Sequence, residues 1–413
     1  MVPPVKMMTT RGRRDMVTWS TIGGTKREDR QVVAFTRSFV VLQIMISTPS
    51  HLHHLAVYTP GASPEEIRRQ YGLSNVEKLA SNENPSGSSP LAIAAAQQAL
   101  ASASIYPDGG QRLRARLADV HGVTPAHISV NNGSDPIIHQ IMHTFLLPGE
   151  TALSCRGGFV SFGIAVRSTG TEPQFVPLTD DYRFDVHALA AAIMPQTKVI
   201  YIPNPNNPTG THITRDELTW FLDQVPNDRL VILDEAYCEY ASHLAPDTYP
   251  DASTMGRDNV IVLRTFSKAY GLAALRVGYA VGHPDVIQWL LRTKLPFDPN
   301  GPACAAAVAA LDDKDFVRKT VELNAEGLAL LHETLRTNGY RTSNSIANFV
   351  MVDCGSPDHA TTFHRTLLER GFISRPLAGF GLPHCVRIST GTNDQNRRLA
   401  AVLRELAGAF VTI

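Results

Sequence analysis

The sequence predicts an α/β fold, with a mostly parallel central sheet in a large domain and a smaller α+β domain at the C-terminus. Two observations carry this prediction. From about Val76, short β-branched runs alternate with longer helical stretches, a pattern typical of a parallel sheet covered by helices on both faces. Near Phe316 one long helical stretch interrupts the alternation, and shorter elements follow it. The 413 residues are enough for two filled cores.

The chain between residues 128 and 263 carries four runs that predict strands, because Gly, Pro, Asn or Asp bounds each of them. They are residues 128–130, 198–202, 230–233 and 260–263. Helices are expected between them at residues 136–146, 185–194 and 215–224, the last with a capping box of Thr214 and Glu217. In such sheets ligands bind beyond the carboxyl ends of the strands, so we expect the site there.

The elements after Phe316 predict the small domain: a helix to Leu335, strands at 349–352 and 385–388, and helices near 361–369 and at the end. We therefore expect a disordered N-terminal extension over residues 1–50 and an arm over 51–84. The large domain is expected over 85–312 and the small domain over 313–413.

Residues 1–44 carry eight Lys or Arg against three Asp or Glu, without a sustained hydrophobic period. Three interpretations stay open for this segment: a targeting peptide, a disordered tail, or a reading frame that truly starts at Met45.

Charge and cysteine content favour a cytoplasmic protein that acts on small molecules. The 38 basic and 38 acidic residues balance, so no overall field attracts nucleic acid or an anionic membrane. The five cysteines are odd in number and form no CxxC pair. This pattern suits a reducing compartment and predicts neither a disulfide framework nor a metal site.

The strongest motif follows the strand at 260–263 and runs Thr265-Phe-Ser267-Lys268-Ala-Tyr-Gly-Leu-Ala-Ala-Leu-Arg276. Lysine can form an imine with an aldehyde, while hydroxyl groups and a guanidinium can hold a phosphate. The segment therefore suits a phosphate-bearing aldehyde, although a lone Ser-Lys pair would more often be a solvated loop.

Two further motifs each follow one of the predicted strands. Asp234 and Tyr237 follow the strand at 230–233, where a carboxylate could pair with a protonated ring nitrogen and make the ring an electron sink. Asn207 lies in a turn with three prolines, which aim its amide at little entropic cost. Taken alone, Asp234 would also fit a metal ligand or a helix cap, and the turn a purely structural role.

A fourth motif, Asn131-Asn-Gly133-Ser134-Asp135, lies between a strand and a helix. Backbone N–H groups at a helix N-terminus attract phosphate. Plain capping would also explain these residues.

Together these segments resemble fold-type-I transferases that depend on pyridoxal 5'-phosphate (PLP), and specifically the histidinol-phosphate aminotransferase family. The resemblance runs from about Tyr58 to the C-terminus. Further motifs that carry it are Tyr58-Thr-Pro-Gly61, Lys78-Leu-Ala-Ser-Asn82-Glu-Asn84-Pro85, Tyr106-Pro-Asp108-Gly109, Arg375-Pro376, Gly381-Leu-Pro383 and Val386-Arg387-Ile388.

The resemblance implies a role for each matching residue. Lys268 is implied as the catalytic Schiff-base lysine, Asp234 as the partner of the ring nitrogen, and Asn207 and Tyr237 as partners of the ring oxygen. Phe159 is implied to stack on the ring. The residues implied at the phosphate are Ser134, Asp135, Thr265, Ser267 and Arg276, with Tyr106 of the other subunit of a homodimer.

For the substrate, the resemblance implies that Arg387 binds the carboxylate or an equivalent anion. It implies that Arg375 and Tyr58 hold the far end, with Tyr58 reaching the neighbouring subunit's site, and Asn84 also counts among the substrate-binding residues. Amino transfer to a 2-oxo acid follows. Five positions depart from the family's usual residues, and none of them removes a chemical group that amino transfer needs: Ser86, Pro136, Phe159, Phe162 and Ala274.

The amino donor stays open at this point. Histidinol phosphate is favoured, and an aromatic amino acid is the alternative because such relatives share the cofactor motifs. A decarboxylase of a phosphorylated amino acid is a third interpretation.

Overall fold

The computed structural model describes residues 48–55 and 61–406. Most of the predicted N-terminal extension, together with Tyr58, therefore lies outside the described residues. The chain from Thr48 onward forms one compact unit.

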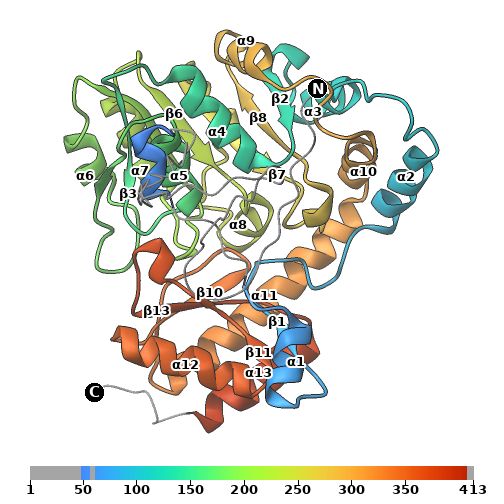
Figure 1. Cartoon of the computed structure of the whole chain (residues 1–413), viewed down its shortest axis with the longest axis vertical. Coiled ribbons are helices and arrows are strands. Elements are labelled where there is room, and N and C mark those ends of the chain that lie inside the picture. The colour runs from blue at the N-terminus through green and yellow to red at the C-terminus, as the bar shows by residue number, and fades with distance from the viewer. Residues whose placement is uncertain (1–47, 56–60, 407–413) are drawn as a thin grey trace, which may run out of the picture. The chain divides into compact units, whose positions relative to one another are not determined.

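A seven-stranded sheet forms the centre of this unit (Figure 1), in the order β2-β8-β7-β6-β5-β3-β4. Its strands are β2 (Ile128–Asn131), β3 (Thr151–Cys155), β4 (Gln174–Val176), β5 (Thr197–Pro203), β6 (Leu230–Asp234), β7 (Val260–Thr265) and β8 (Gly278–Gly282). Strand β8 runs antiparallel to both of its neighbours, and the other pairs are parallel. The prediction of a mostly parallel sheet is confirmed.

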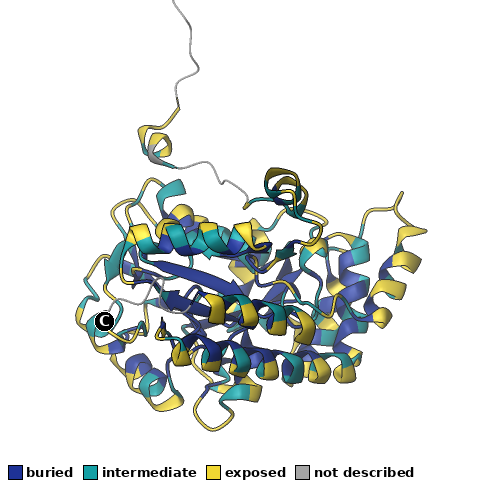
Figure 2. Cartoon of the chain, turned by 90° about the horizontal axis from the view of Figure 1, so that it is seen from below, coloured by how far each residue is buried: buried dark blue, intermediate teal, exposed yellow. Residues whose placement is uncertain are grey.

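Helices cover both faces of the sheet, as side chains that alternate along each strand require. Val199 and Tyr201 of β5 pack with the cluster formed by α4 (Ser134–Phe145), α5 (Val160–Ser168) and α9 (Pro284–Thr293). Ile200 and Ile202 pack on the opposite face with α6 (Val186–Ala191) and α7 (Arg215–Gln224). Figure 2 shows the result as buried strands between helices that expose only their outer sides.

Near β2 and β8 a third cluster joins α2 (Pro90–Leu100), α3 (Gln111–His121) and α10 (Gly301–Asp312). Helix α8 (Cys238–Leu244) completes this part of the chain, while Ile67 of α1 (Pro64–Tyr71) packs with Ile373 near the C-terminal elements (Figure 1).

The C-terminal part begins with the 24-residue helix α11 (Lys314–Thr337). A second sheet follows in the order β12-β13-β10-β9, formed by β9 (Arg341–Thr342), β10 (Phe349–Asp353), β12 (Arg375–Pro376) and β13 (Cys385–Ser389). Helices α12 (Pro357–Glu369) and α13 (Asn393–Glu405) belong to this part, and β1 (Glu77–Lys78) pairs with β11 (Phe372–Ile373). These elements match the expected α+β pattern, while the domain boundaries at residues 84 and 312 stay a prediction.

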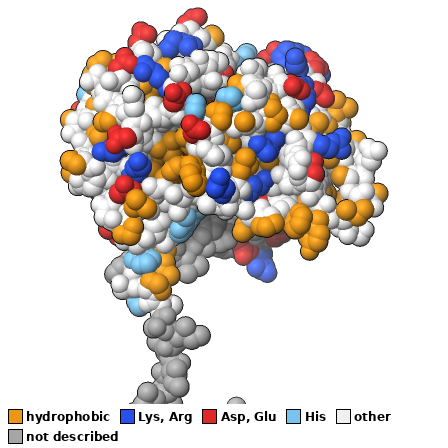
Figure 3. Space-filling view, turned by 90° about the horizontal axis from the view of Figure 1, so that it is seen from above, with side chains coloured by type: hydrophobic (Ala, Val, Ile, Leu, Met, Phe, Trp, Pro, Cys, Tyr) orange, Lys and Arg blue, Asp and Glu red, His pale blue; other side chains and the backbone are white. Residues whose placement is uncertain are grey.

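Basic and acidic side chains are interspersed over the face drawn in Figure 3, without a field of one sign. None of the helices in the described ranges is long and apolar enough to cross a membrane.

Candidate active site

The carboxyl ends of β5, β6 and β7 meet at one edge of the sheet and bring the predicted residues together. Asp234, the last residue of β6, is 5% exposed, and its Oδ2 accepts a hydrogen bond of 2.7 Å from the Tyr201 hydroxyl on β5. Its Oδ1 is buried without a hydrogen-bond partner among the described residues. Burial raises the pKa of this carboxyl to about 6, against the lowering effect of the Tyr201 hydrogen bond. An unpaired buried carboxylate oxygen is costly and therefore marks a position for a cationic donor.

Lys268 follows β7 and faces the same edge. Its Nζ donates to the Ser81 carbonyl at 3.2 Å and lies 5.8 Å from the centre of the Tyr237 ring. Burial, followed by the positive charge of Arg387, lowers the pKa of Lys268 to about 8. A much larger fraction of this amine is neutral near neutral pH than of an ordinary lysine, as a nucleophile or base requires.

Beside Lys268, hydroxyl groups, a guanidinium and a helix N-terminus form a cradle for an anion. The Ser267 N–H donates to Thr265 Oγ1 at 3.1 Å, and Arg276 Nη1 donates to Ser267 Oγ at 3.4 Å. Helix α4 starts at Ser134 after Gly133, and no side chain caps it. The first-turn N–H groups of an uncapped helix are donors for a bound anion.

Two glycines keep this cradle open. A Cβ atom on Gly133 would lie 2.9 Å from Arg276 Nη2, and one on Gly278 would lie 2.6 Å from the Ser134 nitrogen. Both distances are shorter than van der Waals contact, so a larger residue would displace the groups that form the cradle. Asp135, also in the first turn, has a buried Oδ1 without a hydrogen-bond partner among the described residues.

Arg387 on β13 reaches the sheet edge from the C-terminal part of the chain. It is 5% exposed, and its Nη2 donates to the Ala80 carbonyl at 2.7 Å. Its Nη1 donates to Asn207 Oδ1, so two predicted site residues are in direct contact. Arg375 on β12 is the register partner of Arg387 in the antiparallel pair. The two guanidinium-bearing residues therefore start from the same face of this sheet.

The remaining predicted residues differ in how they meet the site. Phe159 precedes α5, and its ring packs partly buried against the core beside that helix. Tyr106 is 77% exposed and stacks on Phe297. Asn84 uses its amide within the protein, donating to the Ala269 carbonyl and to Thr320. A substrate role for Asn84 stays a prediction that these contacts do not favour.

Sequence reasoning missed two contacts of the site. The sequence predicts Tyr201 only as a residue of a strand. Its hydroxyl donates to Asp234 on the neighbouring strand, and a tyrosine near the end of the adjacent predicted strand could have indicated this contact. Asn82 belongs to the motif from which Asn84 was chosen, yet it is Asn82 whose Nδ2 donates to the Tyr237 hydroxyl at 2.9 Å.

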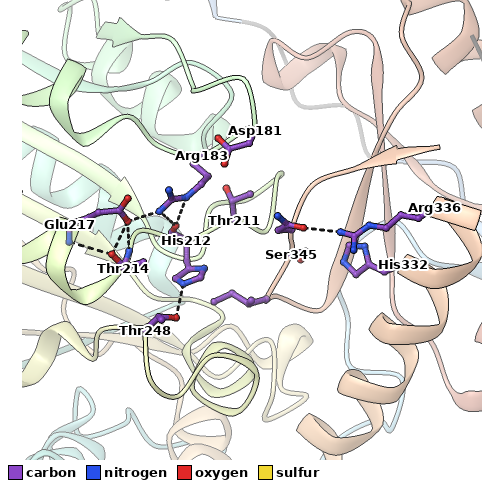
Figure 4. Close-up of a pocket in the computed structure, with 12 residues that line it drawn as sticks. Asp181, Arg183, Thr211, His212, Thr214, Glu217, Thr248, His332, Arg336 and Ser345 are labelled. Carbon is purple, nitrogen blue, oxygen red and sulfur yellow. Dashed lines mark hydrogen bonds and ion pairs between the residues drawn. The ribbon is translucent and has the colours of Figure 1, made fainter. Parts of the chain in front are cut away.

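A cavity of about 550 Å³ lies apart from these residues, between the loop preceding α7 and the helix α11 (Figure 4). Its charged groups already have partners in the wall. Arg183 pairs with Glu217, and Arg336 Nη2 donates to Asn344 at 2.8 Å. None of the predicted site residues lines it, so its size does not make it the reaction site.

Among the described residues, the ligand atoms of Asp353, His384 and Cys385 lie within 4.8 Å of one another and could in principle hold a metal ion. The Tyr182 hydroxyl donates to Asp353 at 2.6 Å and lies 3.2 Å from His384 Nε2. Burial raises the pKa of Cys385 to about 12, so the thiol keeps its proton. Hydrogen bonds within the protein thus account for this cluster, and the predicted lack of a metal site stays a prediction.

Comparisons with known proteins agree with this geometry. The family model of class I and II aminotransferases matches residues 74–403, which places the chain in that class. A histidinol-phosphate aminotransferase from Anaeromyxobacter sp. is 42% identical over 364 residues, covering 87% of this chain and 99% of the relative. Another from Geobacillus sp. is 42% identical, covering 86% and 97%. The chain belongs to the histidinol-phosphate aminotransferase family.

A solved structure supports the same assignment. The histidinol-phosphate aminotransferase from Sinorhizobium meliloti, in complex with pyridoxal-5'-phosphate, matches with a TM-score of 0.78 and 30% identity, covering 91% of this chain and 99% of that one. The predictions of fold type and of an aminotransferase are confirmed.

The residues of this chain fit PLP. The unpaired Asp234 oxygen suits a protonated pyridine nitrogen, and the cradle between Gly133 and Arg276 suits the phosphate. Lys268, whose pKa is lowered, lies close enough to both Asp234 and Arg276 for their charges to act on it.

Proposed function

We propose that this protein transfers the amino group of histidinol phosphate to a 2-oxo acid, 2-oxoglutarate, with PLP as its cofactor, in histidine biosynthesis. The observation that carries the choice of donor is the pairing of Arg375 with Arg387 across β12 and β13.

Like charges directly opposite one another on neighbouring strands destabilise the pair, so an anion that contacts both is favoured. The phosphate ester of histidinol phosphate extends further from the reacting carbon than an amino acid's carboxylate does, and it can carry two charges. A second arginine directly opposite Arg387 on the neighbouring strand suits such a group, because arginine binds phosphate through a bidentate fork. Glutamate, formed in the second half of the cycle, needs only carboxylate partners.

When bound, PLP supplies an aldehyde that takes up the amino group and a ring that accepts electrons from the reacting carbon. Asp234 would hold a proton at the ring nitrogen through its Oδ1, because the Tyr201 hydroxyl donates to the other oxygen, Oδ2. The amine of Lys268 would take the proton from the substrate Cα. Its lowered pKa makes this transfer feasible near neutral pH.

The other residues bind and orient. In the cradle, the backbone N–H groups of Ser134 and Asp135, the hydroxyl groups of Thr265 and Ser267, and the Arg276 guanidinium would hold the phosphate of the cofactor. Asn207 and Tyr237 would orient the ring through its oxygen, and Phe159 would stack on the ring. Tyr58 of the other subunit would hold the far end of the substrate together with Arg375.

The proposal includes a cytoplasmic homodimer. Tyr106 and Phe297 stack at 4.3 Å between ring centres, although they are 77% and 50% exposed. Ile105, next to Tyr106, and Leu295, two residues before Phe297, are 71% and 70% exposed. Exposed apolar side chains of this kind favour a second copy as their cover. The five cysteines are buried and free, which suits a reducing compartment.

The choice of donor is tested by replacing Arg375 with alanine. We expect KM for histidinol phosphate to rise about tenfold or more, with a smaller change in kcat, because a charge-assisted hydrogen bond contributes about 1.5–3 kcal/mol. Steady-state kinetics measures both constants. Arg370→Ala, which removes an exposed arginine paired with Glu405, is the matched control. An unchanged KM in Arg375→Ala would refute phosphate binding at this position.

Subunit mixing tests the dimer and the role of Tyr106. Lys268→Ala and Tyr106→Ala subunits are each expected to be nearly inactive alone. In a mixed dimer, one site combines an intact Lys268 with an intact Tyr106 from the other subunit. Refolding an equal mixture should therefore restore about a quarter of the wild-type rate. No recovery in a mixture that forms dimers would show that Tyr106 does not serve the neighbouring site.

A further inference from the structure

Residues 79–82, which follow β1, contact several site residues through successive groups along the chain. The Leu79 carbonyl accepts from the Ser389 N–H at 2.8 Å, and the Ala80 carbonyl accepts from Arg387. The Ser81 carbonyl accepts from Lys268. One short segment thus connects the lysine at the end of β7 to the arginine on β13.

Asn82 ends this segment in a conformation that few residues adopt. Its φ is 55°, in the left-handed region where Asn, Asp and Gly are favoured, and it is 1% exposed. Its Nδ2 donates to the Tyr237 hydroxyl at 2.9 Å, and its Oδ1 accepts from Ser389 Oγ at 2.9 Å. The amide therefore bridges Tyr237 to β13, two residues from Arg387.

The direction of these hydrogen bonds follows from the donors available. The Asn82 N–H donates to Ser389 Oγ at 2.9 Å. The Ser389 hydroxyl in turn donates to Asn82 Oδ1. The amide NH₂ group is left facing Tyr237, whose oxygen must accept. The Tyr237 proton is then available for another acceptor, and burial raises the pKa of Tyr237, which keeps that proton in place.

We infer that Asn82 is a positioning residue that directs the Tyr237 proton toward the ring oxygen of the cofactor and links it to the strand carrying Arg387. The inference rests on the proposed function, because it concerns how the bound cofactor is polarised. A donor at the ring oxygen stabilises the deprotonated form of the cofactor–lysine linkage, so it lowers the pH at which the bound cofactor's absorption changes.

Two variants that tolerate a positive φ test this inference without added backbone strain: Asn82→Gly and Asn82→Asp. In Asn82→Gly the Tyr237 hydroxyl loses its donor. The pH midpoint of the visible absorption change of cofactor-loaded, substrate-free enzyme should rise by about half a unit. In Asn82→Asp the carboxylate accepts a hydrogen bond from the Tyr237 hydroxyl, which then no longer donates to the ring oxygen. The pH midpoint should therefore rise further.

Asn324→Ala is the matched control, because this buried amide also bridges two protein groups, the Ala347 carbonyl and Thr390, without touching a predicted site residue. It should keep the wild-type midpoint, and thermal melting monitors folding of every variant. A wild-type midpoint in folded Asn82→Gly would overturn the inference. A wild-type protein that shows no cofactor absorption would instead refute the proposed function.

Discussion

Replacing Lys268 with alanine is expected to reduce kcat by at least about 10³-fold, because the reaction then lacks both its amine nucleophile and its base. The lysine is held by the Ser81 carbonyl close to Tyr237, and no other lysine is predicted for the site. The visible absorption of the bound cofactor should change as well, since the covalent link is lost. Absorbance spectra and steady-state rates measure the two effects.

Two further variants sharpen this test. Lys268→Arg keeps a positive charge that stays protonated, and it should be as inactive as the alanine variant. Lys198→Ala removes a lysine at the start of β5, where its Nζ donates to the Asp228 carbonyl, and it should keep the wild-type rate. Near-normal turnover in Lys268→Ala would contradict the role of the lysine.

Replacing Asp234 with asparagine is expected to weaken cofactor retention and to slow the reaction by about 10²-fold or more. Removing one partner of a buried ion pair costs about 3–5 kcal/mol, and 1.36 kcal/mol corresponds to a factor of ten. The amide keeps the shape of the carboxyl, so the change isolates the charge. Equilibrium dialysis gives the cofactor affinity, and a substrate deuterated at Cα shows whether proton removal has become slower.

Asp223→Asn provides the control for this change, since Asp223 forms an ion pair with Arg257 at the surface. It should leave affinity and rate unaltered. A folded Asp234→Asn protein with wild-type affinity and rate would show that the carboxylate does not support the ring nitrogen.

Much of the large sheet could be predicted because local sequence and burial agree there. The predicted runs at 198–202 and 230–233 fall within β5 and β6, whose side chains are buried on both faces and therefore form continuous apolar runs. Both ends of helix α7 agree with the prediction of residues 215–224, and its capping box of Thr214 and Glu217 marks the start. Strand β8 was not foreseen. It is short, begins and ends with glycine, and depends on hydrogen bonds from β2 and β7 on its two sides.

The candidate site was predictable where a residue follows a strand, as Asp234 and Lys268 do. It was not predictable where contacts join segments far apart in the chain. Asn82 meets Tyr237 across 155 positions and Ser389 across 307 positions, and local pattern carries no information about such pairs. The choice between Asn82 and Asn84 therefore required the tertiary structure.

The most direct test of the account is a half-reaction followed by absorbance. Cofactor-loaded protein would be mixed separately with histidinol phosphate, phenylalanine and glutamate, without a 2-oxo acid. We expect rapid conversion to the aminated cofactor with histidinol phosphate, conversion with glutamate, and little with phenylalanine. Rapid conversion with phenylalanine but not with histidinol phosphate would contradict the proposed function.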